Sequence, residues 1–216
     1  MIYSALVSAL LAYLLGSIST SIIVSKLFGE KDIRKKGSGN AGATNTLRVV
    51  GAKAAVLVVV GDAIKGVVSV LLARVISSGV FGIENDTLSV YVASVAVIIG
   101  HVYPLYFGFK GGKGIMTSIA VIFMLDWRIG LILFGVFVVM LILFNYVSLG
   151  SCTGALVYPF AVYFMHNGDI AFFVSAVVVS FIAIFKHRTN IARLLKGTES
   201  KLFKSKDKSE VNADVK

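Results

Sequence analysis

Cysteine and charged residues are scarce in this chain of 216 residues. Its single cysteine, Cys152, lies in an apolar stretch, which excludes a disulfide framework and a cysteine-rich metal site. We expect neither a metal ion nor a cofactor. Charged residues make up only 15% of the chain against 57% hydrophobic residues, and this ratio excludes an ordinary soluble domain. One compact domain in a lipid bilayer is expected instead.

Acidic residues are also outnumbered, with 11 Asp and Glu against 21 Lys and Arg and a formal net charge of +10. The basic residues flank apolar runs instead of covering a soluble surface, so nucleic acid is not the expected partner. Anionic membrane lipid and phosphorylated substrates are the expected partners.

Long apolar runs dominate the rest of the sequence. A membrane-spanning helix needs about 20 mostly apolar residues, and the segments 2–27, 51–77 and 88–107 meet this length. The first of them lacks a basic leader and exceeds a signal-peptide core, so we expect a retained anchor. Beyond Lys113 the sequence remains largely apolar as far as Phe185, and three polar breaks divide this stretch into four more segments. The breaks are residues 126–128, 145–151 and 166–169.

The sequence therefore predicts an all-α, polytopic transmembrane helical bundle with seven spans. Five spans are the alternative, because the segment 115–125 is too short to cross an average bilayer alone.

The distribution of basic residues predicts the orientation of this bundle. Seven Lys and Arg lie between Lys26 and Lys53 and nine more follow from Lys186 onward, whereas the loop 78–87 has none. By the positive-inside rule the first loop and the C-terminus are cytoplasmic and the N-terminus lies outside, which demands an odd number of spans. Residues 200–216 form a charged tail that is expected to be disordered and cytoplasmic.

The first segment that carries chemistry is residues 37–48, in which three glycines precede Thr44 and Arg48. Its G-x-G-x-x-G pattern lacks the preceding hydrophobic strand of a dinucleotide-binding fold. We expect Asn40 to cap a helix N-terminus that binds an anion, with free backbone N–H groups ahead of it and with Thr44 and Arg48 on one face. The alternative is a capped helix whose Arg48 only reaches lipid headgroups.

The second segment surrounds Lys113 with Gly111, Gly112 and Gly114. It is not a P-loop, because glycine follows the lysine where Ser or Thr is needed. The glycines are expected to form a backbone nest for a phosphate, and a flexible basic turn is the alternative. His101 lies just upstream, and we interpret it as a hydrogen-bonded structural group in preference to a proton carrier.

The third segment, residues 186–199, predicts a helix with Gly197 as its C′ residue. His187 and Asn190 share one face of it, whereas an interfacial helix held by anionic lipid is the alternative. Separately, Asp62 and Lys65 stand three residues apart within a span, and a mutual ion pair is favoured over a role beside a site.

Together these segments resemble the bacterial acyl-phosphate:glycerol-3-phosphate acyltransferase family, the membrane enzymes that make lysophosphatidic acid. The resemblance rests on Gly-Ser-Gly-Asn-x-Gly-x-Thr-Asn with Arg48, Gly-Asp-x-x-Lys-Gly, His-x-Tyr-Pro through Gly-Gly-Lys-Gly, and Lys-His-x-x-Asn-Ile-x-Arg. It implies that residues 1–199 form a single acyltransferase domain, which lies in the inner membrane with its active site on the cytoplasmic face. It also implies that the protein acts as a monomer. It implies catalytic roles for Ser38, Asn40, Thr44, Arg48, Lys113, His187 and Asn190. It implies substrate-binding roles for Gly39, Gly42, Asn45, His101, Gly111, Gly112, Gly114, Thr117 and Arg193.

The implied substrates are acyl phosphate and glycerol 3-phosphate. Acyl phosphate is already activated, so direct attack by the glycerol 1-hydroxyl is expected, without an acyl-enzyme. A transporter or channel for a phosphorylated metabolite is the rival, but transporters commonly show internal repeats and a midplane site, and no repeat is visible here.

Overall fold

A computed structural model describes residues 1–203 of the protein, and within them helices, turns and loops form the whole fold, without a strand. Ten α-helices are joined by two short 3₁₀ turns and one π turn. The α-helices are α1 (Ile2–Gly16), α2 (Thr20–Leu27), α3 (Ala43–Val49), α4 (Ala52–Val75), α5 (Thr87–Val102), α6 (Ile115–Leu125), α7 (Trp127–Phe144), α8 (Val147–Met165), α9 (Ile170–Lys186) and α10 (Arg188–Leu195). The shorter elements are η1 (Ile33–Lys35), η2 (Ile76–Val80) and η3 (Leu105–Phe107).

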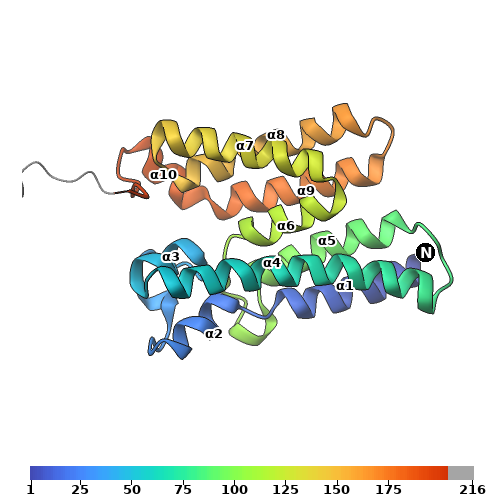
Figure 1. The fold of residues 1–216 in the computed structure, drawn as a ribbon, viewed down its shortest axis with the longest axis horizontal. Coiled ribbons are helices and arrows are strands. Elements are labelled where there is room, and N and C mark those ends of the chain that lie inside the picture. Colours follow the sequence, from blue (N-terminus) through green and yellow to red (C-terminus); the bar gives the residue numbers. More distant parts are fainter. Residues whose placement is uncertain (204–216) are drawn as a thin grey trace, which may run out of the picture.

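The long helices run side by side in two groups (Figure 1). One group contains α1, α4 and α5, the other contains α7, α8 and α9, and α6 lies between them. The short helices α2, α3 and α10 gather at one end of the bundle, which we call the site end, and the N-terminus lies at the opposite, far end.

Glycine allows the closest helix contact, between α1 and α5. A Cβ added at Gly16 would lie 2.2 Å from the Val97 carbonyl oxygen, and one added at Gly100 would lie 2.3 Å from the Tyr13 carbonyl oxygen. Between apolar helices in lipid, close backbone approach through small residues is a main source of attraction. The two glycines therefore fix α5, and with it His101, against the first helix.

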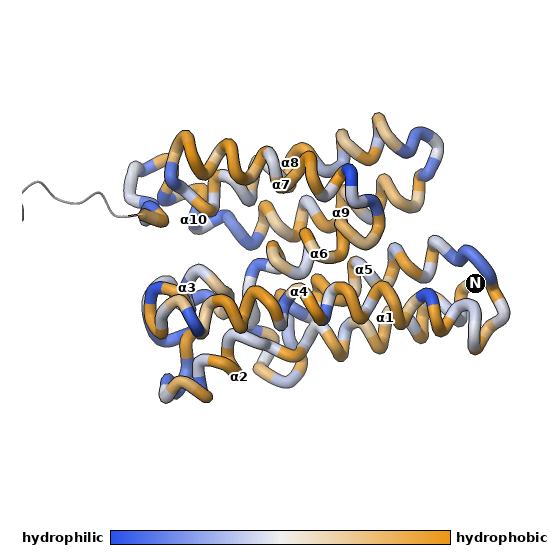
Figure 2. The backbone as a smooth tube through the Cα atoms, in the orientation of Figure 1, coloured by the Kyte–Doolittle hydropathy of each residue, from blue (hydrophilic) through white to orange (hydrophobic). Residues whose placement is uncertain are grey.

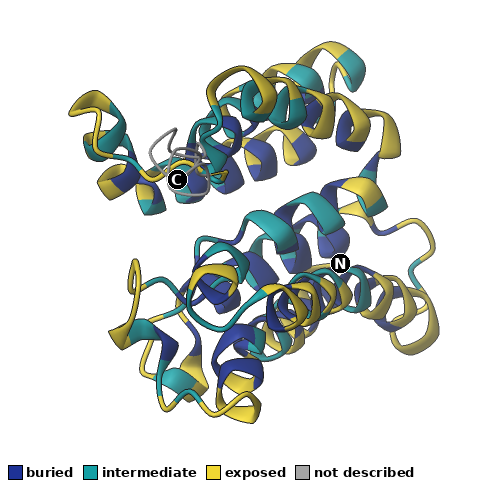
Figure 3. Cartoon of the chain, turned by 60° about the vertical axis from the view of Figure 1, so that its left-hand side comes forward, coloured by how far each residue is buried: buried dark blue, intermediate teal, exposed yellow. Residues whose placement is uncertain are grey.

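The core joins the two groups of helices. Tyr91 of α5 stacks on Phe172 of α9 with ring centroids 4.8 Å apart, and Tyr158 of α8 meets the same phenylalanine edge-on. Figure 3 shows the buried residues on the inward faces of the helices and the exposed residues on their outward faces. Most of those outward residues on the long helices are large and apolar, as lipid contact requires.

Within residues 1–203, five helical segments are long and apolar enough to cross a membrane: Ile2–Leu27, Ala52–Val80, Thr87–Phe107, Trp127–Phe144 and Val147–Met165. A sixth crossing is possible by the same criteria if α9 and α10, which are bent by 56° at His187, count as one span. Hydrophilic segments collect toward the two ends of the bundle (Figure 2). Of the seven spans predicted from the sequence, the fourth corresponds to α6, which has 11 residues and does not meet the length criterion.

Helix α6 starts partway along the bundle. Near its first turn Thr117 donates to the carbonyl oxygen of Asp62, ten residues into α4, and near its last turn Arg74 at the end of α4 donates to the Met124 carbonyl oxygen. At about 1.5 Å per residue, α6 spans about 16 Å. The loop before α6 therefore descends from the site end into the bundle and carries Lys113 with it.

The beginning of the predicted tail is held in place. The backbone of Phe203 exchanges two hydrogen bonds with the Asn145 side chain, and Leu202 N donates to the Asn145 carbonyl oxygen. The rest of the predicted tail, residues 204–216, lies outside the described residues.

Candidate functional site

The three glycine-bearing segments meet in one hollow at the site end, which we call the site cleft. Its volume is about 350 Å³, and α3, α4, α8, α10 and the loop before α6 contribute to its wall. All seven residues predicted to be catalytic line it: Ser38, Asn40, Thr44, Arg48, Lys113, His187 and Asn190. Four residues predicted to bind substrate line it as well: Gly42, Asn45, His101 and Gly114.

Asn45 organises the first segment from below. Its Oδ1 accepts from the backbone N–H of Ser38 at 2.8 Å, and its Nδ2 donates to the carbonyl oxygens of Ile33 and Lys36. The side chain is almost fully buried. Asn45 therefore shapes the loop that presents Ser38 and Asn40 to the cleft.

The predicted N-cap at Asn40 is wrong. Helix α3 begins at Ala43 with Gly42 in the N-cap position and without a side-chain cap. The N–H groups of Ser38 and Gly39 are also not free, because Asn45 and the Lys36 carbonyl oxygen accept from them. Hydrogen bonds within the first segment and the turn before it therefore occupy donors that the prediction left free for an anion.

The glycine loop, residues 108–114, is packed tightly against α5. Gly111 N donates to the Val102 carbonyl oxygen and Gly112 N donates to the His101 carbonyl oxygen, both at 3.2 Å. The predicted phosphate nest is therefore wrong for these two N–H groups. A Cβ at Gly111 would lie 2.0 Å from the His101 carbonyl oxygen, so the glycines serve close approach. This packing fixes the position of Lys113.

Helix α10 ends as the sequence predicted. Gly197 has a φ of +67°, its N–H donates to the Leu194 carbonyl oxygen, and Thr198 N donates to the Arg193 carbonyl oxygen. This is the Schellman pattern, which requires a left-handed residue at C′. The turn brings Glu199 back beneath the helix.

Glu199 anchors a chain of hydrogen bonds that ends at Lys113. Its Oε1 accepts from Ser148 Oγ and from Asn190 Nδ2, and its Oε2 accepts from Arg193 Nε, all within 2.8 Å. Because the amide nitrogen of Asn190 is used in this way, its Oδ1 faces the cleft and accepts from Lys113 Nζ. The carboxylate orients Asn190, and Asn190 orients the ammonium.

His187 stands at the bend between α9 and α10. Its Nδ1 lies 2.7 Å from the Ala183 carbonyl oxygen, which can only accept, so Nδ1 carries the proton of this bond. In the neutral ring Nε2 is then an acceptor. Since the ring lines the cleft, Nε2 is the nitrogen left for a substrate hydroxyl.

A basic vestibule of about 730 Å³ opens beside the site cleft. It shares Ser38, Asn40, Lys113 and Asn190 with the cleft. Three residues predicted to bind substrate line the vestibule instead of the cleft: Gly39, Gly111 and Arg193. Its other cationic residues are Arg34, Lys35, Lys110, Lys186 and Arg188.

Two of the predicted substrate-binding residues lie outside both hollows. Thr117 is fully buried and its hydroxyl donates to the Asp62 carbonyl oxygen, so it ties α6 to α4. Gly112 is enclosed between His101 and the carbonyl oxygen of Ala41. Both residues support the site without lining it.

Sequence reasoning missed Arg34. Its NH1 donates to the carbonyl oxygens of Phe107 and Lys110, at 2.7 and 3.3 Å, while Asp32 holds the other side of the guanidinium. The side chain therefore joins the first loop to the glycine loop. The only sequence signal at this position is the run of basic residues around it. Such a run usually lies in solvent, so it does not predict a structural contact.

An apolar groove continues from the site cleft into the bundle. It runs among α6, α7, α8 and α9, and it shares Ile115, Met116, Phe137 and Ser151 with the cleft. On the α8 side, the groove is lined by Gly150 and Gly154, which have no side chains to fill it, and by Tyr158 further along the same helix. The lining is almost entirely apolar, which suits a hydrocarbon chain.

The predicted ion pair within α4 is present. Lys65 Nζ lies 2.8 Å from Asp62 Oδ1, and both side chains are buried. The pair also contacts His101, which lines the site cleft.

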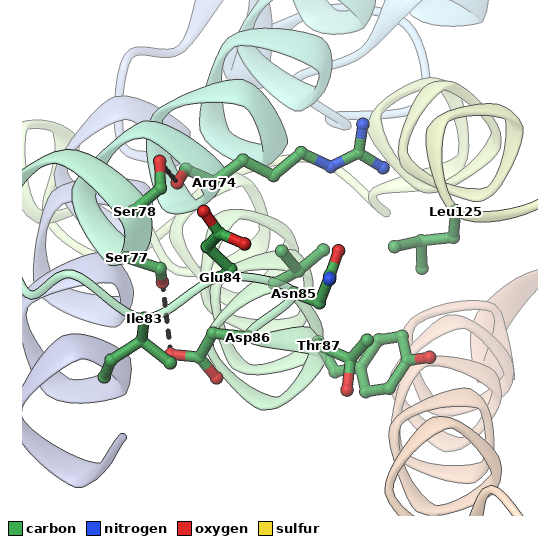
Figure 4. Close-up of a pocket in the computed structure, with 11 residues that line it drawn as sticks. Arg74, Ser77, Ser78, Ile83, Glu84, Asn85, Asp86, Thr87 and Leu125 are labelled. Carbon is green, nitrogen blue, oxygen red and sulfur yellow. Dashed lines mark hydrogen bonds between the residues drawn. The ribbon is translucent and has the colours of Figure 1, made fainter.

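A further cavity, of about 510 Å³, lies at the far end of the bundle (Figure 4). Asp86 points into it beside Ser77, but this carboxylate caps α5 through Ser89 N and accepts from the Ser77 hydroxyl. Arg74 is bonded to the Met124 carbonyl oxygen. Asp86, Ser77 and Arg74 therefore already have partners within the fold, and the cavity lies far from the segments that meet at the site end.

Known proteins are similar to this chain over most of its length. A family model described as glycerol-3-phosphate acyltransferase matches residues 6–197. A glycerol-3-phosphate acyltransferase from Thermoanaerobacter pseudethanolicus is 42% identical over 92% of this chain and 96% of its own length. One from Clostridioides difficile is 40% identical over 95% of this chain and 99% of its own length.

Solved structures are similar over the same range. The crystal structure of the integral membrane glycerol 3-phosphate acyltransferase PlsY, in its glycerol 3-phosphate form, is 38% identical with a TM-score of 0.82. The matched region covers 92% of this chain and 95% of the chain in that crystal structure. The lysophosphatidic acid form gives a TM-score of 0.80 at 37% identity.

Proposed function

The chain belongs to the glycerol-3-phosphate acyltransferase family, and on this basis we propose that it transfers a fatty acyl group from acyl phosphate to the 1-hydroxyl of glycerol 3-phosphate. The products are lysophosphatidic acid and inorganic phosphate. The observation that carries the proposal is the convergence of three basic segments on one cleft that opens into a basic vestibule on one side and an apolar groove on another.

Two substrate phosphates explain the number of cations. Arg48 and Lys113 line the cleft, and the vestibule beside it carries further Lys and Arg side chains. A guanidinium binds a phosphate through two parallel hydrogen bonds, whereas an ammonium acts as a point charge. A single small metabolite would need fewer of them. We propose that glycerol 3-phosphate enters through the vestibule and that the acyl phosphate headgroup lies near Arg48.

The transfer is proposed to be direct. The 1-hydroxyl oxygen bonds to the acyl carbon, the bond from that carbon to the phosphate oxygen breaks, and the hydroxyl proton passes to the departing phosphate. His187 Nε2 is the protein group placed to orient the hydroxyl. Cys152 does not line the cleft, and Ser38 has no histidine partner among the described residues, so no activated nucleophile is evident there.

The topology follows from the same proposal. Residues 1–199 form one domain in the bacterial inner membrane, with the N-terminus outside and the site end on the cytoplasmic face, where glycerol 3-phosphate is made available. Helix α6 is proposed to complete seven crossings: its first turn meets the middle of α4, and its last turn meets the far end. The protein is proposed to act as a monomer surrounded by membrane lipid.

An assay of purified protein in detergent tests the function. Palmitoyl phosphate and glycerol 3-phosphate are supplied, and release of inorganic phosphate and formation of lysophosphatidic acid are followed. Turnover with palmitoyl phosphate but not with palmitoyl-CoA supports the proposal. Absence of turnover, with uptake of glycerol 3-phosphate into vesicles instead, would favour a transporter.

The apolar groove predicts control of acyl-chain length. Gly154→Leu is expected to fill part of the groove, because a Cβ at this position meets only the Leu133 carbonyl oxygen, at 3.8 Å. We expect kcat/KM for palmitoyl phosphate to fall about tenfold relative to that for octanoyl phosphate, the effect of about 1.4 kcal/mol of overpacking. Gly135→Leu, on the exposed face of α7, is the matched control. An equal fall for both donors would mean that the long chain lies elsewhere.

Loss of the positive charge of Lys113 is expected to limit activity at alkaline pH. Burial lowers the pKa of Lys113 to about 8, so the free enzyme loses this positive charge as the pH rises above that value. We expect kcat/KM for glycerol 3-phosphate to fall by about tenfold per unit above pH 8, because kcat/KM reports groups of the free enzyme. Lys113→Arg, if active, should keep its rate to higher pH. A flat wild-type profile up to pH 10 would contradict this role.

A further inference from the structure

Three buried polar side chains lie directly beneath the glycine loop. Asp62 and Lys65 come from α4 and His101 comes from α5, and their exposed fractions are 2%, 6% and 7%. The ion pair between Asp62 and Lys65 is sufficient to neutralise their two charges within the membrane, so His101 is not needed for that purpose. His101 and Asp62 both line the site cleft, and of these two the histidine is the one that can donate a hydrogen bond to a substrate oxygen.

The hydrogen bonds of Lys65 determine the tautomer of His101. Lys65 Nζ lies 2.8 Å from Asp62 Oδ1, 3.2 Å from the Ile18 carbonyl oxygen and 2.8 Å from His101 Nδ1. An ammonium has three protons and no lone pair, so each of these contacts is a donation. His101 Nδ1 is therefore an acceptor, and the proton of the neutral ring is on Nε2.

Nε2 of His101 points toward the glycine loop. A Cβ added at Gly112 would lie 2.2 Å from it. Among residues 1–203, the hydrogen bonds of the His101 ring involve Nδ1, and Nε2 makes none. The ring therefore offers a free N–H donor at the wall of the cleft, next to the loop that carries Lys113.

The carboxylate of Asp62 is held from two sides. Thr20 Oγ1 donates to its Oδ1 at 3.1 Å in addition to Lys65. With its charge balanced by the carboxylate, Lys65 affects His101 mainly through the direction of one hydrogen bond. We propose that Asp62 and Lys65 are positioning residues that hold His101 as an Nε2–H donor to a phosphate oxygen of the bound substrate.

This proposal rests on the proposed function, and kinetics of two His101 variants test it. His101→Phe removes the donor, whereas His101→Gln keeps an N–H near the position of Nε2. We expect His101→Phe to raise KM about 10- to 100-fold, the range for one hydrogen bond to a charged group, with a smaller change in kcat. His101→Gln should restore most of the affinity.

The substrate whose KM rises identifies the phosphate. A rise for glycerol 3-phosphate assigns the acceptor, and a rise for palmitoyl phosphate assigns the donor. His166→Gln is the matched control, because His166 also contacts a carboxylate, Asp126 at 2.7 Å, but lies at the far end of the bundle. Unchanged KM values in His101→Phe, or equal effects of Phe and Gln, would overturn the proposal.

The tautomer is measured directly by NMR of protein labelled with ¹⁵N-histidine. The wild-type protein should show His101 protonated on Nε2 with Nδ1 bare. Lys65→Met should move the proton toward Nδ1, where Asp62 Oδ1, 3.4 Å away, can accept it. A purely structural ion pair would leave the tautomer unchanged.

The wild-type spectrum keeps the test decisive even if Lys65→Met does not fold, because a ring protonated on Nδ1 in the wild-type protein overturns the proposal. Wild-type protein that shows no turnover at all would instead refute the proposed function, while the NMR result would still decide whether Lys65 sets the tautomer.

Discussion

Replacement of Lys113 by methionine is expected to lower kcat/KM for glycerol 3-phosphate by about 100- to 1000-fold, the loss seen when one preorganised charge-stabilising donor is removed. The ammonium is held by Asn190, which Glu199 holds in turn, so it reaches the substrate without reorganisation. Methionine keeps most of the length of the side chain and removes the charge together with its N–H donors. The measurement is the initial rate of phosphate release with purified protein.

Lys53→Met is the control for this substitution. Lys53 is an exposed lysine in the first turn of α4, near the same end of the bundle, and it lines neither the site cleft nor the vestibule. Its loss should change the rate little. Equal losses in the two variants would show that Lys113 acts through the overall charge of this face and not through a specific contact.

Gly112→Ala is expected to lower kcat/KM about 100-fold, because a misplacement of about 1 Å in a positioning element has an effect of this size. The added Cβ would lie 2.2 Å from His101 Nε2 and 2.6 Å from the Ala41 carbonyl oxygen, and neither distance is tolerated. The loop must then move away from α5, and Lys113 moves with it. The rate is measured alongside the melting temperature.

Gly79→Ala serves as the control for that comparison, since a Cβ there meets nothing within 4 Å and the residue lies at the far end. Full activity in Gly112→Ala would mean that the loop adapts without loss and that the glycine is not required for catalysis.

Much of the site could be predicted from the sequence because the relevant signals are local. Charge counting placed the basic segments on one face, and the structure brings those segments to one end of the bundle. Gly197 predicted the end of α10 correctly, because a left-handed C′ residue is set by neighbouring residues. The ion pair of Asp62 and Lys65 followed from their spacing on one helix.

The errors concern loops whose path decides the hydrogen bonds, although the partners lie only three to eleven positions apart. The sequence predicts Asn40 as the cap of α3, but Asn45 and Lys36 occupy the loop amides ahead of that helix. The nest predicted at Gly111 and Gly112 is wrong because carbonyl oxygens of α5 accept from both N–H groups. A pattern of residue types does not specify how such a loop folds back on its neighbours.

The contact of Lys65 with His101 joins residues 36 positions apart on two different helices, and no pattern in either helix predicts it. The length of α6 is a different case. The sequence identified it correctly as too short, but only the contacts of its two ends with α4 indicate which part of the bundle it occupies.

The central claim is that acyl phosphate and glycerol 3-phosphate occupy one cleft together and react directly. Initial rates measured while both substrate concentrations are varied test it. Double-reciprocal lines that intersect are predicted, because a complex with both substrates must form before the acyl group moves. Parallel lines, the pattern of an acyl-enzyme that forms before the second substrate binds, would contradict it.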